Sequence, residues 1–279
     1  MGQPIIHVDE STFGLCYNDP NCKLYCGRFL GTKLPLNSFD LVVTSPPYNI
    51  GSKAKRDDKG RQNGGYDRKS FGAIRDYPDN MPESEYQEWQ HDVLCRCGRL
   101  IKDNGVVVYN HKERHRDGRL VCPNEWFPKT LVLHESITWD RGNTLNWGKR
   151  LLAQLDEKIY VFKKDRQSKY YFSRGTSKDP MHTRTNIWRF NRANNKNKHC
   201  APFPVEIPTW CIKLWCDKKG KVLDPFLGSG TSMIAALNSG CRFVGVELMI
   251  DYVMMSIERL KEHGFYKERY DLTLKKKTA

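Results

Sequence analysis

The chain has 279 residues, of which 39% are hydrophobic and 11% aromatic, enough to build a core and too many for a disordered chain. Lys and Arg number 46 against 32 Asp and Glu, and this net charge of +14 favours a polyanionic partner such as nucleic acid. No segment reaches the roughly 18 apolar residues that span a bilayer, and the N-terminus does not resemble a signal peptide, so we expect a cytoplasmic protein without a membrane partner.

The first half of the chain contains the elements of a βαβ unit. Residues 39–44 and 105–110 are short apolar runs, typical of strands that are buried on both faces of a parallel sheet. Between them, apolar residues recur with helical spacing over residues 82–101. Pro82 can begin this helix, because proline is favoured in the first helical turn.

The first of these strands ends abruptly at Ser45-Pro46-Pro47-Tyr48. Neither proline nitrogen can donate a hydrogen bond, so the sheet ladder stops there. The carboxyl end of a strand in an open parallel sheet is where ligands bind. A rigid turn with a serine hydroxyl offers fixed acceptors for a substrate amino group, and Tyr48 offers a flat ring for stacking. The alternative is a proline-capped structural turn, which we would favour if these four residues stood alone.

A second unit lies near the C-terminus, where a strand over residues 221–226 leads through Gly228-Ser229-Gly230 into a helix over 231–238. Another strand over 242–247 and a helix over about 250–262 follow. This order of strand, glycine loop, helix and strand is that of a cradle for a nucleotide-type cofactor.

The glycine loop and the next strand supply the expected cofactor contacts. Glycines allow close approach of the backbone to a ligand, and the following helix directs its N–H groups there. Glu247 ends the next strand, where a carboxylate accepts hydrogen bonds from ribose hydroxyls. The alternative is an ordinary βα turn followed by a surface glutamate. A dinucleotide is disfavoured because a third glycine at the required spacing is missing.

These motifs resemble those of the DNA amino-methyltransferases, which transfer a methyl group from S-adenosyl-L-methionine (SAM) to N4 of cytosine or N6 of adenine. T-S-P-P-Y (44–48) looks like their catalytic motif, and D-P-F-L-G-S-G-T (224–231) looks like their cofactor motif. The catalytic motif comes first, as in the permuted β class. Residues 103–110, 137–142 and 201–208 add to the resemblance. It implies a Rossmann-like α/β methyltransferase fold, with a mostly parallel twisted sheet and helices on both faces.

The resemblance also implies roles for individual residues. The catalytic turn would be Ser45, Pro46, Pro47 and Tyr48, with Tyr48 stacked on a base flipped out of the duplex. The SAM contacts would be Asp224, Pro225, Phe226, Gly228, Ser229, Gly230, Thr231 and Glu247. Arg28 departs from the pattern, because it stands where many members carry an acid that contacts the cofactor adenine. The chemistry needs no metal, and the ten cysteines lack the paired spacing of a zinc site.

Two segments are expected to meet double-stranded DNA. Residues 51–80 are glycine-rich and charged, and we predict a mobile loop that orders over DNA. A target-recognition region is predicted at about 143–198, inserted between the catalytic and cofactor halves of a single catalytic domain that spans the whole chain. The predicted contacts to phosphates and base edges are Lys53, Lys55, Arg56, Arg166, Lys169, Arg174, Arg184, Arg189 and Arg192. The alternative is a solvated basic face with some core aromatics, and Trp188 is predicted to belong to the core.

Several alternatives remain open from the sequence. Serine at position 45 favours N4-cytosine, whereas aspartate is commoner among N6-adenine members of this class. The same turn could act on RNA or on a protein glutamine, and a non-catalytic nucleic-acid-binding relic of the fold is the remaining alternative. A restriction endonuclease as functional partner is compatible with the resemblance, as is either a monomer or a homodimer.

Overall fold

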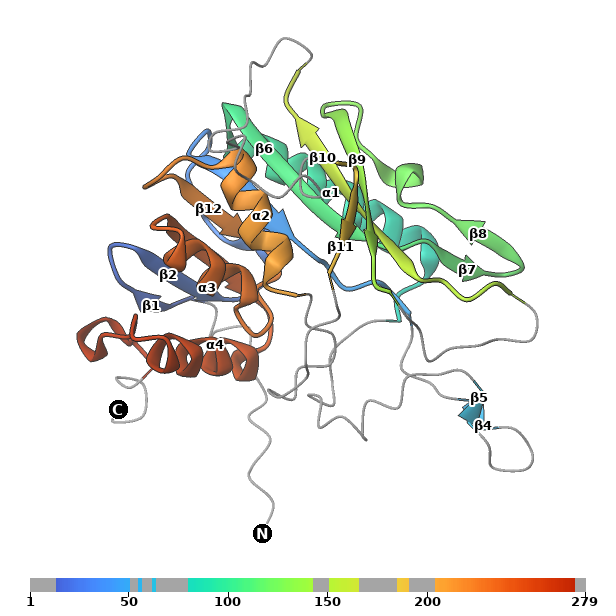
Figure 1. Cartoon of the computed structure of the whole chain (residues 1–279). Coiled ribbons are helices and arrows are strands. Elements are labelled where there is room, and N and C mark those ends of the chain that lie inside the picture. Colours follow the sequence, from blue (N-terminus) through green and yellow to red (C-terminus); the bar gives the residue numbers. More distant parts are fainter. Residues whose placement is uncertain are drawn as a thin grey trace.

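A computed structural model describes residues 14–50, 80–142, 151–165, 185–190 and 204–273, and the backbone alone at 55–56 and 62–63. The described part is an α/β structure built on one nine-stranded sheet with four α-helices (Figure 1). No helix in these ranges is long and apolar enough to cross a membrane.

The large sheet has the strand order β1-β2-β13-β12-β3-β6-β10-β9-β11. Its strands, in that order, are β1 (Gly14–Asn18), β2 (Cys22–Cys26), β13 (Arg242–Glu247), β12 (Lys221–Asp224), β3 (Phe39–Thr44), β6 (Ile101–His111), β10 (Asp156–Lys163), β9 (Val132–Asp140) and β11 (Ile187–Arg189). The run from β2 to β6 is parallel, whereas β10 is antiparallel to both of its neighbours. Two small hairpins pair β4 (Lys55–Arg56) with β5 (Gln62–Asn63) and β7 (Arg114–Arg116) with β8 (Arg119–Val121).

Helices cover both faces of the sheet, as predicted. α1 (Glu83–Leu100) lies on one face, while α2 (Glu206–Trp215), α3 (Thr231–Asn238) and α4 (Ile250–Glu262) lie on the other (Figure 1). The strands contribute side chains to both cores, because successive side chains of a strand point to opposite faces of the sheet. In β3, Leu41 and Val43 belong to the core under α2 and α3, and Val42 belongs to the core under α1.

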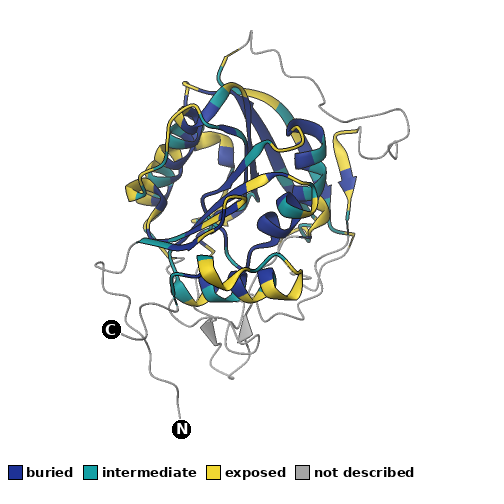
Figure 2. Cartoon of the chain, turned by 90° about the vertical axis from the view of Figure 1, so that its left-hand side faces the viewer, coloured by how far each residue is buried: buried dark blue, intermediate teal, exposed yellow. Residues whose placement is uncertain are grey.

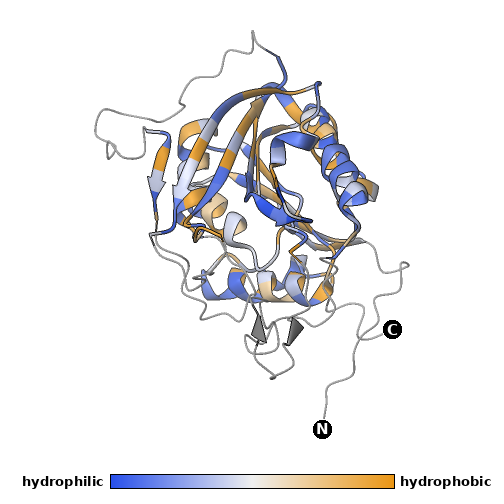
Figure 3. Cartoon of the chain, turned by 90° about the vertical axis from the view of Figure 1, so that its right-hand side faces the viewer, coloured by the Kyte–Doolittle hydropathy of each residue, from blue (hydrophilic) through white to orange (hydrophobic). Residues whose placement is uncertain are grey.

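Burial follows this layering. Figure 2 shows buried residues along the strands and on the inner sides of the helices, with exposed residues on their outer sides. Figure 3 shows hydrophobic segments on both the strands and the helices, with hydrophilic segments between them. Trp188 on β11 is fully buried, which confirms that it belongs to the core.

The predicted elements agree closely with the structure. β3, α3, β13 and α4 have the predicted bounds, and α1 differs by one residue at each end. Strand β6 begins earlier than predicted, at Ile101, directly after the last residue of α1. The strand before the glycine loop, predicted over 221–226, ends at Asp224 in the structure. The next residue, Pro225, has no N–H with which to continue the ladder.

Part of the predicted recognition region belongs to the sheet. Within 143–198, β10 is an interior strand and β11 is the edge strand next to β9. The remaining parts of that region, 143–150, 166–184 and 191–198, lie outside the described residues, as does most of the predicted loop at 51–80.

Candidate active site

The parallel strands bring their carboxyl ends to one edge of the sheet. β12 pairs directly with β3, with Val222 opposite Leu41 and Leu223 opposite Val42. Ser45 therefore follows one strand where Pro225 follows its neighbour. The two motifs, 180 residues apart in the chain, are joined by a buried hydrogen bond of 2.7 Å from Thr44 Oγ1 to Asp224 Oδ1.

The proline corner is fixed from the side of α1. The Tyr86 hydroxyl donates to the Pro47 carbonyl at 2.6 Å and also lies 2.7 Å from His111 Nε2. Burial lowers the pKa of His111 to about 3, so its imidazole is neutral at physiological pH. The His111 ring lies against Tyr48, with 4.6 Å between the ring centroids. Pro46 is buried, while Ser45 and Tyr48 are half-buried.

A polar network surrounds the hydroxyl groups of this corner. Ser45 Oγ lies 2.8 Å from the Tyr48 hydroxyl, which donates to Glu157 Oε2 at 2.9 Å. Asn110 Nδ2 donates to the same carboxylate oxygen at 3.0 Å and to the phenol oxygen at 2.6 Å. Arg141 donates to the other carboxylate oxygen, Glu157 Oε1, at 3.1 Å. Burial, and next the charge of Glu157, raise the pKa of the Tyr48 phenol well above its ordinary value.

Three members of this network were not predicted individually. Asn110 and Arg141 fall in two segments that carried the family resemblance, 103–110 and 137–142, but the sequence assigned them no role. Glu157 had no sequence signal at all. It reaches the site because β10 runs antiparallel to β6, so that its first residues lie beside the end of β6.

In the cofactor motif, the Asp224 side chain is engaged within the protein. Besides Thr44, its carboxylate accepts hydrogen bonds from the Ser232 hydroxyl and from the Phe226 backbone N–H. Burial raises its pKa to about 6. Asp224 therefore links the end of β3 to the start of the glycine loop through hydrogen bonds.

The glycine loop has the conformation that its sequence predicts. Gly228 and Gly230 have φ angles of 53° and 82°, a region that other residues rarely adopt. A Cβ at Gly230 would lie 2.9 Å from both Met233 Cε and Ser256 Oγ. The Ser229 carbonyl and the Thr231 hydroxyl both accept hydrogen bonds from Arg259, so α4 holds this loop in place.

Glu247 faces the same loop from the end of β13. Its two carboxylate oxygens accept the backbone N–H groups of Gly228 at 2.8 Å and Met249 at 3.0 Å. Burial raises its pKa to about 7. Each carboxylate oxygen has a second acceptor position, so Glu247 can still receive hydroxyl groups of a ligand.

The residues present fit SAM. A carboxylate with acceptor capacity suits ribose hydroxyls, and a loop without Cβ atoms suits close approach of the ligand. Half-buried Phe226 supplies an aromatic surface, with the rings of Trp89 and Phe29 centred 5.5 and 6.4 Å away. Arg28 is exposed and follows β2, the neighbour of β13, so it stands at this edge where a carboxylate is usual in the family.

The predicted DNA contacts can be placed only in part. Arg189 ends β11 opposite Asp140, at the same edge as Ser45, and its exposed side chain forms an ion pair with Asp140. Lys55 and Arg56 form strand β4, of which only the backbone is described. The other predicted contacts lie outside the described residues: Lys53, Arg166, Lys169, Arg174, Arg184 and Arg192.

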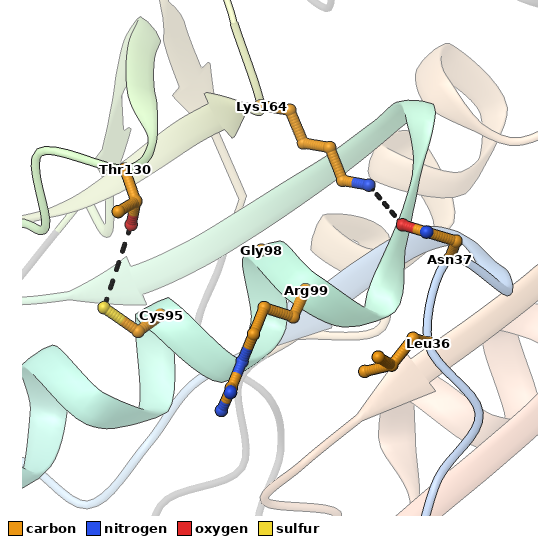
Figure 4. A pocket seen from close by; sticks show the side chains of 7 residues that line it. All are labelled: Leu36, Asn37, Cys95, Gly98, Arg99, Thr130 and Lys164. Atoms are coloured by element: carbon orange, nitrogen blue, oxygen red, sulfur yellow. Dashed lines mark hydrogen bonds between the residues drawn. The ribbon is translucent and has the colours of Figure 1, made fainter.

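One surface hollow lies away from this edge. Leu36, Asn37, Arg99 and Lys164 are among the residues that line it, where β3 and β6 begin and β10 has just ended (Figure 4). The Lys164 ammonium donates to Asn37 there. Because Ser45 and Asn110 stand at the opposite ends of β3 and β6, this hollow is separate from the candidate site. Within the described ranges, no cluster of three His, Cys, Asp or Glu residues could hold a metal ion.

The chain is similar to known proteins in sequence and in fold. A family model for N6 and N4 methyltransferases, described as DNA methylase, matches residues 39–258. The type II methyltransferase M.HpaI of Haemophilus parainfluenzae is 27% identical over 80% of this chain and 68% of its own length. The DNA adenine methyltransferase YhdJ of Escherichia coli K12 is 26% identical over 84% of this chain and 80% of its own.

Solved structures share the fold. The PvuII DNA methyltransferase, which is cytosine-N4-specific, superposes with a TM-score of 0.68 at 18% identity, over 92% of this chain and 91% of its own. TTHA0409 of Thermus thermophilus, a putative DNA modification methylase solved with SAM, gives a TM-score of 0.60 at 23% identity, over 86% and 93%. The Rossmann-like methyltransferase fold is thereby confirmed.

Proposed function

Since the chain belongs to the N6/N4 DNA methylase family, we propose that it methylates N4 of cytosine, flipped out of double-stranded DNA, at the corner formed by Ser45, Pro46, Pro47 and Tyr48. The cofactor is SAM, which supplies an electrophilic methyl group when bound. The observation that carries the proposal is the adjacency of the two motifs. The Thr44–Asp224 hydrogen bond joins them at neighbouring strand ends, where a base amine and a methyl donor can meet.

The chain's part in the reaction is to position and polarise the amine. Ser45 Oγ and the Pro46 carbonyl accept its hydrogen atoms, which strengthens an otherwise poor nucleophile as its N–H bonds polarise. The Pro47 carbonyl is already held by Tyr86. The Tyr48 ring stacks on the base, and the glycine loop with Glu247 holds the cofactor so that both partners meet in one orientation.

Serine at position 45 supports cytosine as the target, because aspartate is commoner there among adenine-specific members of the class. The E. coli relative named above is an adenine methyltransferase, and this observation favours N6-adenine as the second candidate. Both reactions need base flipping and an array of acceptors, so the proposed site is the same for either base.

The test is to incubate the protein with SAM and unmethylated duplex DNA of mixed sequence, digest the product to nucleosides and identify them by mass spectrometry. We expect N4-methyldeoxycytidine. N6-methyldeoxyadenosine would move the function to the second candidate. A parallel incubation with RNA in place of DNA tests the substrate class, and methylation in that reaction alone would refute DNA as the substrate. A Tyr48→Ala preparation, made in the same methylase-deficient host, is the control for contaminating activity, and it should bind SAM but form no product.

A further inference from the structure

The side chains of Ser45, Tyr48 and Glu157 form a continuous chain of hydrogen bonds that leads away from the proposed amine site. We infer that Glu157 sets the direction of this chain and receives the proton that the amine loses on methylation. The inference rests on the proposed function, and it adds a positioning and proton-accepting residue that neither proposed motif contains.

The direction of the chain follows from the donors available. A carboxylate only accepts, and Tyr48 has a single hydroxyl proton, which it donates to Glu157 Oε2 at 2.9 Å. Tyr48 therefore has no proton left for Ser45. In the 2.8 Å contact between their oxygens, Ser45 must be the donor. The Ser45 hydroxyl proton is turned toward Tyr48. One lone pair of Ser45 Oγ faces Asn110 Nδ2 in a long contact of 3.3 Å, and the other is left for an incoming amine.

Two neighbours reinforce this direction. Asn110 has one amide nitrogen within 3.0 Å of Glu157 Oε2 and 2.6 Å of the Tyr48 oxygen, so the carboxylate fixes which end of the amide faces the chain. One of its two N–H groups donates to the carboxylate, and the other donates to the phenol oxygen. Arg141 holds Glu157 Oε1 at 3.1 Å and keeps the other oxygen toward Tyr48. Side chains of Arg141 and Glu157 are only 13% and 10% exposed, so water competes little for these bonds.

The chain gives the surplus proton a path. When the amine nitrogen bonds to the methyl carbon, the carbon–sulfur bond breaks and its electron pair stays on sulfur, so the nitrogen carries one proton too many. That proton passes to Ser45 Oγ as the serine proton moves to the Tyr48 oxygen and the tyrosine proton moves to Glu157 Oε2. One N–H and two O–H bonds break and three O–H bonds form, which leaves a neutral methylated amine and a protonated Glu157.

Glu157→Gln reverses this arrangement with little change in volume. Arg141 is a donor, so it holds the amide oxygen of the new side chain and turns the amide nitrogen toward Tyr48. The phenol then accepts from Gln, its own proton turns to Ser45, and the serine proton points at the amine. Tyr48→Phe is the second variant, because it removes the hydroxyl and retains the ring that is proposed to stack on the base.

The experiment measures single-turnover methylation with saturating SAM and DNA, together with SAM affinity by calorimetry. Both variants should lose about 10²-fold or more in rate, the usual contribution of a positioned proton acceptor, while SAM affinity stays within twofold of wild type. Glu125→Gln is the matched control, because Glu125 also forms an ion pair with an arginine, but its partner is Arg119 on strand β8 of the β7–β8 hairpin. It should methylate at the wild-type rate. Wild-type rates for Glu157→Gln and Tyr48→Phe would overturn the inference.

A second measurement does not depend on turnover. In protein labelled with ¹³C at the tyrosine ring carbon that bears oxygen, Tyr48 is identified by its loss in Tyr48→Phe. The negative charge of Glu157 and its acceptance of the phenol proton both raise the pKa of Tyr48. The phenol should therefore ionise at lower pH in Glu157→Gln than in wild type. If the pKa of Tyr48 is the same in Glu157→Gln and wild type, the Tyr48–Glu157 hydrogen bond is refuted, whether or not the protein methylates cytosine. If the pKa of Tyr48 is lower in Glu157→Gln but turnover stays at the wild-type rate, only the proton path is refuted.

Discussion

We expect Glu247 to make SAM binding dependent on pH near neutrality. The residue is only 4% exposed, and burial raises the pKa of its carboxyl group to about 7. Below that pH the free protein carries a protonated Glu247. Ribose hydroxyls donate best to the ionised form, so binding at lower pH must expel the proton. SAM affinity should therefore be highest above pH 7 and should decrease as the pH falls below 7.

The size of the effect follows from the pKa. For a site that binds only when ionised, the dissociation constant scales with 1 + 10^(pKa − pH), which gives about a fourfold rise between pH 8 and pH 6.5. We limit the comparison to pH 6.5–8 because burial also raises the pKa of Asp224 to about 6. Below pH 6.5, protonation of Asp224 would add a second change in SAM affinity.

Calorimetry of SAM binding to wild type and Glu247→Gln measures this effect. The amino group of SAM titrates near pH 8, but it does so equally with both proteins, so the readout is the ratio of their dissociation constants. Loss of the charged acceptor should weaken binding by roughly 10- to 100-fold at pH 8. The ratio should shrink about fourfold by pH 6.5. A ratio that stays constant across the window, or equal affinities throughout, would remove Glu247 from the cofactor site.

Three further predictions concern the glycine loop, the Thr44–Asp224 hydrogen bond and the binding of DNA. Gly230→Ala should abolish SAM binding in calorimetry and lower the melting temperature more than Gly118→Ala, because both glycines have φ near 80° but only at Gly230 would the Cβ meet other atoms, at 2.9 Å. Thr44→Val should cost about 1–3 kcal/mol in urea unfolding by removing a donor from buried Asp224, whereas Thr44→Ser should cost less. DNA affinity should fall about 10³-fold or more between 50 and 200 mM salt if the net charge of +14 reflects six or more phosphate contacts. Fluorescence-anisotropy titrations measure this affinity. An affinity that does not change with salt would contradict the prediction that the basic segment binds DNA phosphates.

The elements that were predicted well have strong local signals. α1 repeats buried residues such as Tyr86, Val93 and Leu100 at helical spacing, and β3 and β13 are short apolar runs beside polar residues. The elements that were missed have weaker ones. β1 (GLCYN) and β2 (CKLYC) are only five residues long and show no regular alternation of polar and apolar residues. They are strands because β1 pairs with β2 and β2 pairs with β13.

The candidate site also contains residues that the sequence could predict and residues that it could not. Both motifs were predicted from local composition, since proline and glycine restrict or free the backbone wherever they occur. The use of Asp224 could not be predicted, because its partners Thr44 and Ser232 are defined by strand order and loop closure rather than by sequence spacing. The residues predicted to contact DNA stay predictions, apart from the placement of Arg189 at the catalytic edge.

Glu157 illustrates why strand direction matters to this site. In a wholly parallel sheet, the catalytic edge receives only residues from the ends of strands, as with Thr44 and Glu247. β10 runs the other way, with Lys158 opposite His111, so it delivers its second residue to that edge and its last ones to the opposite edge. One reversed strand thus places a buried carboxylate behind the proline corner. The serine of this corner supplies no charge of its own, and the carboxylate acts on it through the hydroxyl of Tyr48.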